Sequence, residues 1–214
     1  MRTVDALGEL QQLRRSVVET GEVVARLDVS RVRASQILHS LEEAGLVSRL
    51  RRGLWLLKPE ADPFSIPPYL TSPFPAYVSL WSALSKHGMI EQIPRQVFVV
   101  SLDRPRQVET PIATYSIHHL APEVFGGYSG SSDAGYIATP EKALFDAVYL
   151  PSARRGAVYL PELELPEIFD ESELTAWAQR ISAPWLRTKV SRELDRLLTE
   201  VGEDGAKAPK APSS

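Results

Sequence analysis

Cysteine is absent from this 214-residue chain, which excludes disulfides, thiolate zinc sites and thiol catalysis. Long apolar runs are also missing. None approaches the roughly 18 residues that a membrane helix needs, so no membrane span is expected. The start of the chain has no apolar stretch followed by a small-residue cleavage site, so no secretory signal is expected. These absences predict a soluble protein of the cytoplasm.

Histidine is scarce, and its spacing does not suggest a metal site. The four histidines are His39, His87, His118 and His119, and none is spaced with carboxylates as metal ligands are. His118 and His119 are adjacent, and neighbouring residues of a strand face opposite sides. We therefore do not expect the two imidazoles to act together in acid–base chemistry, and we expect neither a metal nor a cofactor.

Catalytic motifs are missing as well. The glycine-rich segment 126–135 (GGYSGSSDAG) is the best candidate for a phosphate cradle, but it lacks the Gly-Lys-Ser/Thr of a P-loop. Asp133 is not followed by the second carboxylate with which nucleotidyltransferases hold metal. We interpret this segment as a flexible surface loop. The sequence does not suggest an enzyme, and a nuclease or nucleotidyltransferase is the weakest of the functions considered.

Charge is distributed unevenly along the chain. The net charge is −3, but residues 1–58 hold ten Arg and Lys against seven Asp and Glu, whereas residues 59–214 hold fourteen against twenty. A basic end joined to an acidic body is expected when only one part of a protein meets phosphate. The N-terminal part is therefore the candidate for nucleic-acid binding.

Proline marks the division between two predicted domains. Residues 59–75 contain six prolines, which predicts an extended connector whose apolar side chains lie against the second domain. The expected fold class is α+β: an N-terminal winged helix-turn-helix at 1–58 is followed by a mixed α/β domain with C-terminal helices at 76–202. Small polar residues predict a disordered tail at 203–214.

The N-terminal domain is predicted from helical spacing and end signals. Apolar residues three or four apart give one helical face at 5–18. Ser30 is a good N-cap and Gly45 a good terminator for the third helix. The full prediction is three helices, at 5–18, 22–27 and 31–44, followed by two antiparallel strands, at 46–50 and 54–57. This is the order of parts in a winged helix-turn-helix.

The outward positions of the third predicted helix and the hairpin tip carry donors for base edges and phosphates. These residues are Ser30, Arg31, Arg33, Ser35, Gln36, His39, Ser40, Arg49, Arg51 and Arg52. Acidic residues appear only at the far end of that helix. His39 is expected to contact phosphate or water, and Trp55 to pack in the core rather than stack on a nucleotide. The alternative is a merely solvated face, or a winged fold that binds protein.

The second domain reads as mixed helices and strands. Thr139 and Pro140 give an N-cap and a first helical residue, and β-branched residues favour a buried strand at 95–102. The other strands are expected at 112–118 and 135–138. The helices are expected at 77–86, 141–150, 171–181 and 184–201.

Two motifs in the second domain carry a resemblance to a known family. They are the segments SLWSALSKHGMIEQIPRQVFVVS at 79–101 and YIATPEKALFDAVYL at 136–150. In these segments the chain resembles the AbiEi family of antitoxins, the transcription-regulating members of type IV toxin–antitoxin pairs. The order of winged helix-turn-helix, proline-rich joint and mixed α/β domain also agrees with that family.

The resemblance implies two activities. Family members repress their own operon by binding inverted repeats in double-stranded operator DNA, and their second domain counteracts a nucleotidyltransferase-fold toxin. A monomer that pairs on the inverted repeat is expected. The positions that match the motifs are Ser79, Ser82, His87, Glu141, Lys142 and Asp146. Their structural alternative is also open, since the serines can allow close helix packing and Glu141 and Lys142 can complete a helix cap.

A second function class remains open at this point. A winged-helix repressor that responds to a small ligand, with no toxin partner, has the same composition. The neighbouring gene separates the two, because a nucleotidyltransferase-like reading frame beside this one favours the antitoxin.

Overall fold

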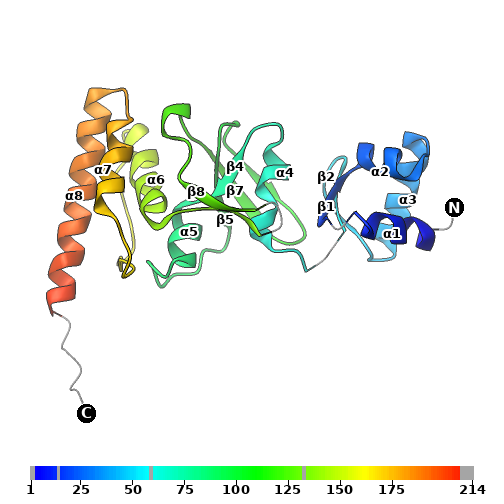
Figure 1. Ribbon diagram of the computed structural model, residues 1–214, viewed down its shortest axis with the longest axis horizontal. Helices are drawn as coiled ribbons and strands as arrows, with labels where there is room; N and C mark the ends of the chain where they lie inside the picture. Colours follow the sequence, from blue (N-terminus) through cyan, green and yellow to red (C-terminus); the bar gives the residue numbers. More distant parts are fainter. Residues whose placement is uncertain (1–2, 14, 58–59, 132–133, 208–214) are drawn as a thin grey trace, which may run out of the picture.

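The computed structural model describes residues 3–13, 15–57, 60–131 and 134–207. The molecule is elongated and layered, and its fold class is α+β (Figure 1). Helices at the N-terminal end pack on a small sheet, a short connector follows, and a larger sheet with the C-terminal helices forms the other end (Figure 1). Within the described residues, no helix has the length and apolar character required to cross a membrane.

The N-terminal region runs helix, strand, helix, helix, strand, strand. Its elements are α1 (Thr3–Gln11), β1 (Val17–Glu19), α2 (Thr20–Leu27), α3 (Arg31–Glu43), β2 (Ser48–Arg51) and β3 (Leu54–Leu56). The strands form an antiparallel sheet in the order β1-β3-β2. The predicted ends of α3 are confirmed: Ser30 Oγ accepts a hydrogen bond from Arg33 N, and Gly45 follows the helix with φ +69°.

The predicted helix at 5–18 is wrong in its second half. α1 ends at Gln11, and Val17 and Val18 instead pair with β3. Val17 continues the helical spacing of the leucines before it, so periodicity alone assigned it to the helix. Pairing with β3 gives both valines backbone partners and buries them on opposite faces of the sheet. Residue 14 lies outside the described part of the chain.

This small sheet is buried on both faces. Val18, Trp55 and Leu57 pack against the helices α1–α3. Leu54 and Leu56, from the same strand β3, face the other way, into a second cluster that includes the connector and the larger sheet. The small sheet therefore shares one core cluster with the body on one face and packs against the N-terminal helices on the other.

The connector is not extended as predicted. It contains a 3₁₀ turn, η1 (Pro63–Ser65), and a short helix, α4 (Pro67–Thr71). Proline is tolerated in the first turn of a helix because the missing N–H has no partner there. The expected packing of the apolar connector is confirmed, since Ile66 and Leu70 are buried between the two sheets. The predicted boundary at 58–59 lies outside the described residues.

The larger sheet has six strands in the order β6-β7-β5-β4-β9-β8. Their bounds are β4 (Ala76–Val78), β5 (Val97–Ser101), β6 (Arg106–Glu109), β7 (Thr114–His119), β8 (Tyr128–Ser131) and β9 (Gly135–Ala138). The pairs β4–β9 and β5–β7 are parallel, and the other pairs are antiparallel.

Helices cover the face of this sheet that points away from the N-terminal region (Figure 1). They are α5 (Leu80–Lys86), α6 (Pro140–Ala153), α7 (Glu171–Gln179) and α8 (Pro184–Lys207), and a 3₁₀ turn, η2 (Pro122–Val124), lies between α5 and α6 in the chain. The predicted cap of α6 is confirmed, because Thr139 Oγ accepts a hydrogen bond from Lys142 N. The connector and the small sheet cover the opposite face.

Three predictions for the body are corrected. Tyr77 belongs to strand β4 rather than to a helix beginning at 77, because its backbone pairs with Val100. Part of the predicted loop 126–135 is strand β8, which pairs with β9, while residues 132–133 lie outside the described chain. α8 continues to Lys207, whereas a disordered tail was expected at 203–214; residues 208–214 are likewise not described.

Candidate nucleic-acid interface and the motif residues

The first two turns of α3 present polar side chains to solvent. Ser30, Arg31, Arg33 and Gln36 are exposed, and Ser35 is half-buried. Buried apolar residues on the opposite side of α3 fix this orientation. No acidic residue lies in the first turn. The exposed half of α3 therefore offers hydrogen-bond donors and positive charge without a competing carboxylate.

Sequence reasoning missed Val32, which lies on the same exposed turn. Its side chain is 70% exposed, although valine is usually buried. An exposed apolar side chain between two arginines can contact the methyl group of thymine in the major groove. The sequence signal was available, since a valine at this position cannot face the core when Ala34 and Ile37 do.

His39 and Arg49 lie together against Trp55. The His39 ring meets Trp55 edge-on at 5.4 Å between centroids, and the Arg49 guanidinium lies 5.9 Å from the centre of the Trp55 ring. His39 Nδ1 also lies 3.2 Å from Glu42 Oε2. The prediction that Trp55 packs in the core is confirmed: it is buried, and its Nε1 donates to Thr20 Oγ1 at 3.0 Å.

The hairpin arginines do not all face the same way. Arg49 lies on the side of β2 that meets the α3 helix, through its contact with Trp55. Arg51 turns toward the connector, where its Nη2 donates to the Tyr69 carbonyl at 3.1 Å. Arg52 is exposed at the tip. The structure thus places Arg49 beside His39 and separates Arg51 from that face.

The motif residues of the body converge on Asp146, which is fully buried in α6. Ser79 Oγ donates to Asp146 Oδ2 at 2.7 Å, and Tyr77 OH donates to the same oxygen at 3.1 Å. The other carboxylate oxygen forms an ion pair with Lys142 Nζ, one turn earlier in the helix. One carboxylate therefore joins segments that are 67 or more residues apart in sequence.

Burial opposes both charges of this ion pair. Burial raises the pKa of Asp146 and lowers the pKa of Lys142, while the ion pair and the hydroxyl hydrogen bonds act in the opposite direction. Burial also raises the pKa of Tyr77 far above its ordinary value, with the neighbouring Asp146 carboxylate adding to the shift. The Lys142 ammonium lies over the rings of Phe145 and Trp177, at 4.8 and 4.6 Å, which gives it further stabilisation without water.

The remaining motif residues are also engaged inside the protein. Ser82 Oγ accepts from Phe98 N at 2.8 Å and holds α5 against β5. His87 Nε2 lies 2.7 Å from the Ala138 carbonyl, and Glu141 Oε1 accepts from Asp170 N at 3.0 Å. These contacts join α5 to β9 and α6 to the start of α7. All six residues therefore hold elements of the body together, although the serines do so by hydrogen bonds rather than by allowing close helix packing.

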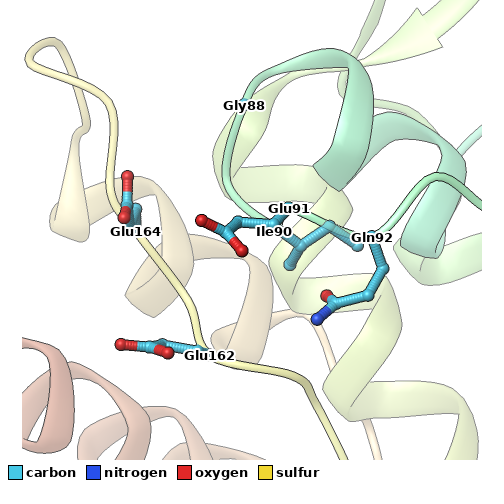
Figure 2. A pocket seen from close by; sticks show the side chains of 6 residues that line it. All are labelled: Gly88, Ile90, Glu91, Gln92, Glu162 and Glu164. Carbon is cyan, nitrogen blue, oxygen red and sulfur yellow. The ribbon is translucent and has the colours of Figure 1, made fainter.

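A pocket on the body has a polar lining that includes none of the six motif residues. Figure 2 shows it between the loop after α5 and the segment before α7, with a volume of about 290 Å³ and a lining that includes Glu91, Glu162 and Glu164. Among the described residues, no group of three or more histidines or carboxylates is arranged to hold a metal ion. His118 and His119 have separate partners, Ser116 Oγ and the Asp103 carbonyl.

The sequence was also compared with known proteins. Neither a scan against protein-family models nor a search of curated proteins gives a match. The functional assignment therefore depends on the geometry of α3, the hairpin and the body.

Proposed function

We propose that the N-terminal region is a winged helix-turn-helix that binds double-stranded DNA, and that the chain represses transcription of its own operon. One observation carries this proposal. The exposed first two turns of α3 combine Arg31, Arg33 and Gln36 with no carboxylate. The major groove admits a helix, and arginine and glutamine are the side chains that read guanine and adenine there.

The arrangement around α3 supports the same function. The order of helices and strands in this region is that of a winged helix, and the short segment 28–30 joins α2 to α3 as a helix-turn-helix requires. Arg49 lies on the α3 side of the hairpin, and Arg52 is exposed at its tip. Arginines placed beside a recognition helix can bind the flanking phosphates.

The direct test is binding to the DNA upstream of the chain's own gene. Fluorescence anisotropy should give a tighter Kd for this duplex than for a random duplex of equal length. The logarithm of the affinity should fall linearly with the logarithm of the salt concentration, because bound phosphates release counterions. Equal affinity for the two duplexes at moderate salt would contradict the proposal that the chain recognises an operator upstream of its own gene.

The resemblance to the AbiEi family supports a second activity, the restraint of a nucleotidyltransferase-fold toxin by the body. We propose this activity on the resemblance, together with the carboxylates of Glu91, Glu162 and Glu164 that gather at one hollow (Figure 2). Such a surface suits a basic partner. Co-expression with a toxin encoded beside this gene should restore growth, and failure to restore growth would contradict the activity.

The alternative is a repressor that responds to a small ligand. It makes a different prediction about the genome, because it needs no nucleotidyltransferase-like reading frame next to this gene. Absence of such a frame, together with a change in operator affinity on addition of a metabolite, would favour the ligand-responsive repressor.

A further inference from the structure

Two arginines from different layers of the molecule meet at the C-terminal end of α4. Arg51, from the hairpin, donates through Nη2 to the Tyr69 carbonyl at 3.1 Å. Arg106, from the edge strand β6 of the body, donates through Nη2 to the Leu70 carbonyl at 2.8 Å. These carbonyls belong to consecutive residues, so an arginine of the N-terminal region and an arginine of the body both bind the C-terminal end of α4.

Two further arginines adjoin this pair: Arg52 follows Arg51 at the hairpin tip, and the Arg104 carbonyl accepts a hydrogen bond from Arg106 Nη1 at 3.2 Å. We call Arg51, Arg52, Arg104 and Arg106 the junction strip. Arg52 and Arg104 are exposed. Within the described part of the chain, neither side chain forms a hydrogen bond or a close ion pair, and the Arg104 guanidinium contributes only at longer range to the lowered pKa of Asp103. The nearby carboxylate of Asp103 is paired with Arg106 at 2.5 Å. The junction strip therefore keeps a net positive charge, although residues 59–214 as a whole are acidic.

We propose that the junction strip binds backbone phosphates of DNA that flanks the segment read by α3. This inference rests on the proposed DNA-binding function and adds the body to the interface. Arg52 belongs to the hairpin tip and Arg104 to the turn before β6, so the strip continues from the proposed wing onto the body. Phosphate contacts of this kind position a protein on the duplex without reading its sequence.

The arrangement of the four arginines fits phosphate binding better than it fits capping of the α4 carbonyls alone. A guanidinium carries five N–H donors, and Arg51 gives one hydrogen bond to the connector. That hydrogen bond restricts the Arg51 side chain while its other donors stay exposed to solvent, so less conformational freedom is lost when a phosphate binds. Capping the carbonyls of α4 explains Arg51 and Arg106. It does not explain the exposed Arg52 and Arg104.

Arg104 gives the cleanest test, because its side chain is exposed and its replacement leaves the packing of α4 intact. The wild-type footprint on the upstream region defines two duplexes: the whole protected segment, and the same segment trimmed at its flanks to the part that α3 protects. R104E is compared with R192E, which makes the same charge change on α8, where the Arg192 side chain is 73% exposed. Thermal melts of both variants confirm folding.

R104E should bind the whole segment about fivefold or more weakly per lost phosphate contact at physiological salt, with a shallower salt dependence. It should bind the trimmed duplex as the wild type does, and R192E should change neither affinity. Equal effects of R104E and R192E on the whole segment would overturn the inference, as would equal weakening of both duplexes by R104E. If the wild type binds neither duplex better than random DNA, the proposed function itself fails.

Discussion

The helices α3 and α6 use similar polar residues in opposite ways. α3 opens with Arg31 and Arg33, whose side chains are exposed. α6 opens with Lys142 and Asp146, which are completely buried and satisfied by each other and by Ser79. Both helices begin at a hydroxyl cap, on Ser30 and Thr139 respectively.

The exposure of these polar residues decides whether they can bind a partner or only stabilise the fold. Polar groups that lie outward keep their donors available for a partner, whereas buried polar groups must be satisfied within the fold. The buried motif residues around Asp146 therefore serve the fold, because they join α6 to β4 and to Ser79, which precedes α5. The less conspicuous face of α3 leaves its donors available to a partner.

The largest expected effect comes from breaking the buried cluster. Asp146→Ala leaves the Lys142 ammonium buried without its counter-charge and the hydroxyls of Ser79 and Tyr77 without an acceptor. Removing one partner of a buried ion pair costs about 3–5 kcal/mol. Urea unfolding followed by circular dichroism should show a lower free energy of unfolding by about this amount.

The double variant K142M/D146L is the matched control. It removes both charges together, so it should recover a large part of the lost stability. If D146A is as stable as the wild type, the cluster does not support the fold. That result would contradict the claim that the buried polar residues of α6 stabilise the protein.

A smaller effect is expected at the sheet that the two regions share. Leu56 is fully buried on the face of β3 that meets the connector. Leu56→Ala should lower the free energy of unfolding by about 2–4 kcal/mol, because it removes buried methyl groups and leaves a cavity. The urea transition should remain single.

Val32→Ala is the control for this prediction, since the exposed Val32 side chain should change stability by less than about 0.5 kcal/mol. Two separate transitions in the wild-type protein would contradict a common core between the N-terminal region and the body.

Sequence patterns predicted best the helices whose ends are marked by capping or terminating residues. Both ends of α3 and the start of α6 were placed correctly because Ser30, Gly45 and Thr139 mark them, whereas α6 continues three residues beyond its predicted end. β1 was missed because Val17 continues the helical spacing of the leucines before it, and a three-residue strand cannot reveal a partner strand that lies 35 or more positions away. Edge strands β6 and β8 were missed because arginine, serine and glycine in them give little alternation of apolar and polar residues.

The candidate sites were predictable to different degrees. Helical periodicity shows which residues face outward, so the exposure of most of the α3 residues could be predicted. The burial of Lys142 and Asp146 depends on which elements cover α6, here Trp177 of α7 and Tyr77 of β4. Charged residues usually lie at the surface, so sequence alone could not place this pair in the core.

The smallest expected effect concerns pH. Burial, with the nearby Arg154 guanidinium, lowers the pKa of His118 below its ordinary value of 6.5. The unfolded chain then binds more protons below pH 6.5, so the free energy of unfolding falls as the pH drops from that value toward the folded pKa. His118→Gln should remove this part of the pH dependence in urea titrations between pH 7 and pH 5.

Ser116→Ala serves as its control. It removes the hydroxyl that His118 contacts but keeps the imidazole buried, so the pH dependence should persist. An unchanged pH dependence in His118→Gln would show that this imidazole does not contribute.

The central claim is that the outward polar face of α3 binds DNA. Its most direct test is an anisotropy titration of the upstream duplex with the wild type, R31A/R33A and R192A/R196A, the last of which removes two arginines from α8. We expect R31A/R33A to bind at least about tenfold more weakly, with a salt slope smaller by about 2, and R192A/R196A to bind as the wild type does. Equal affinity of R31A/R33A and the wild type would contradict the claim.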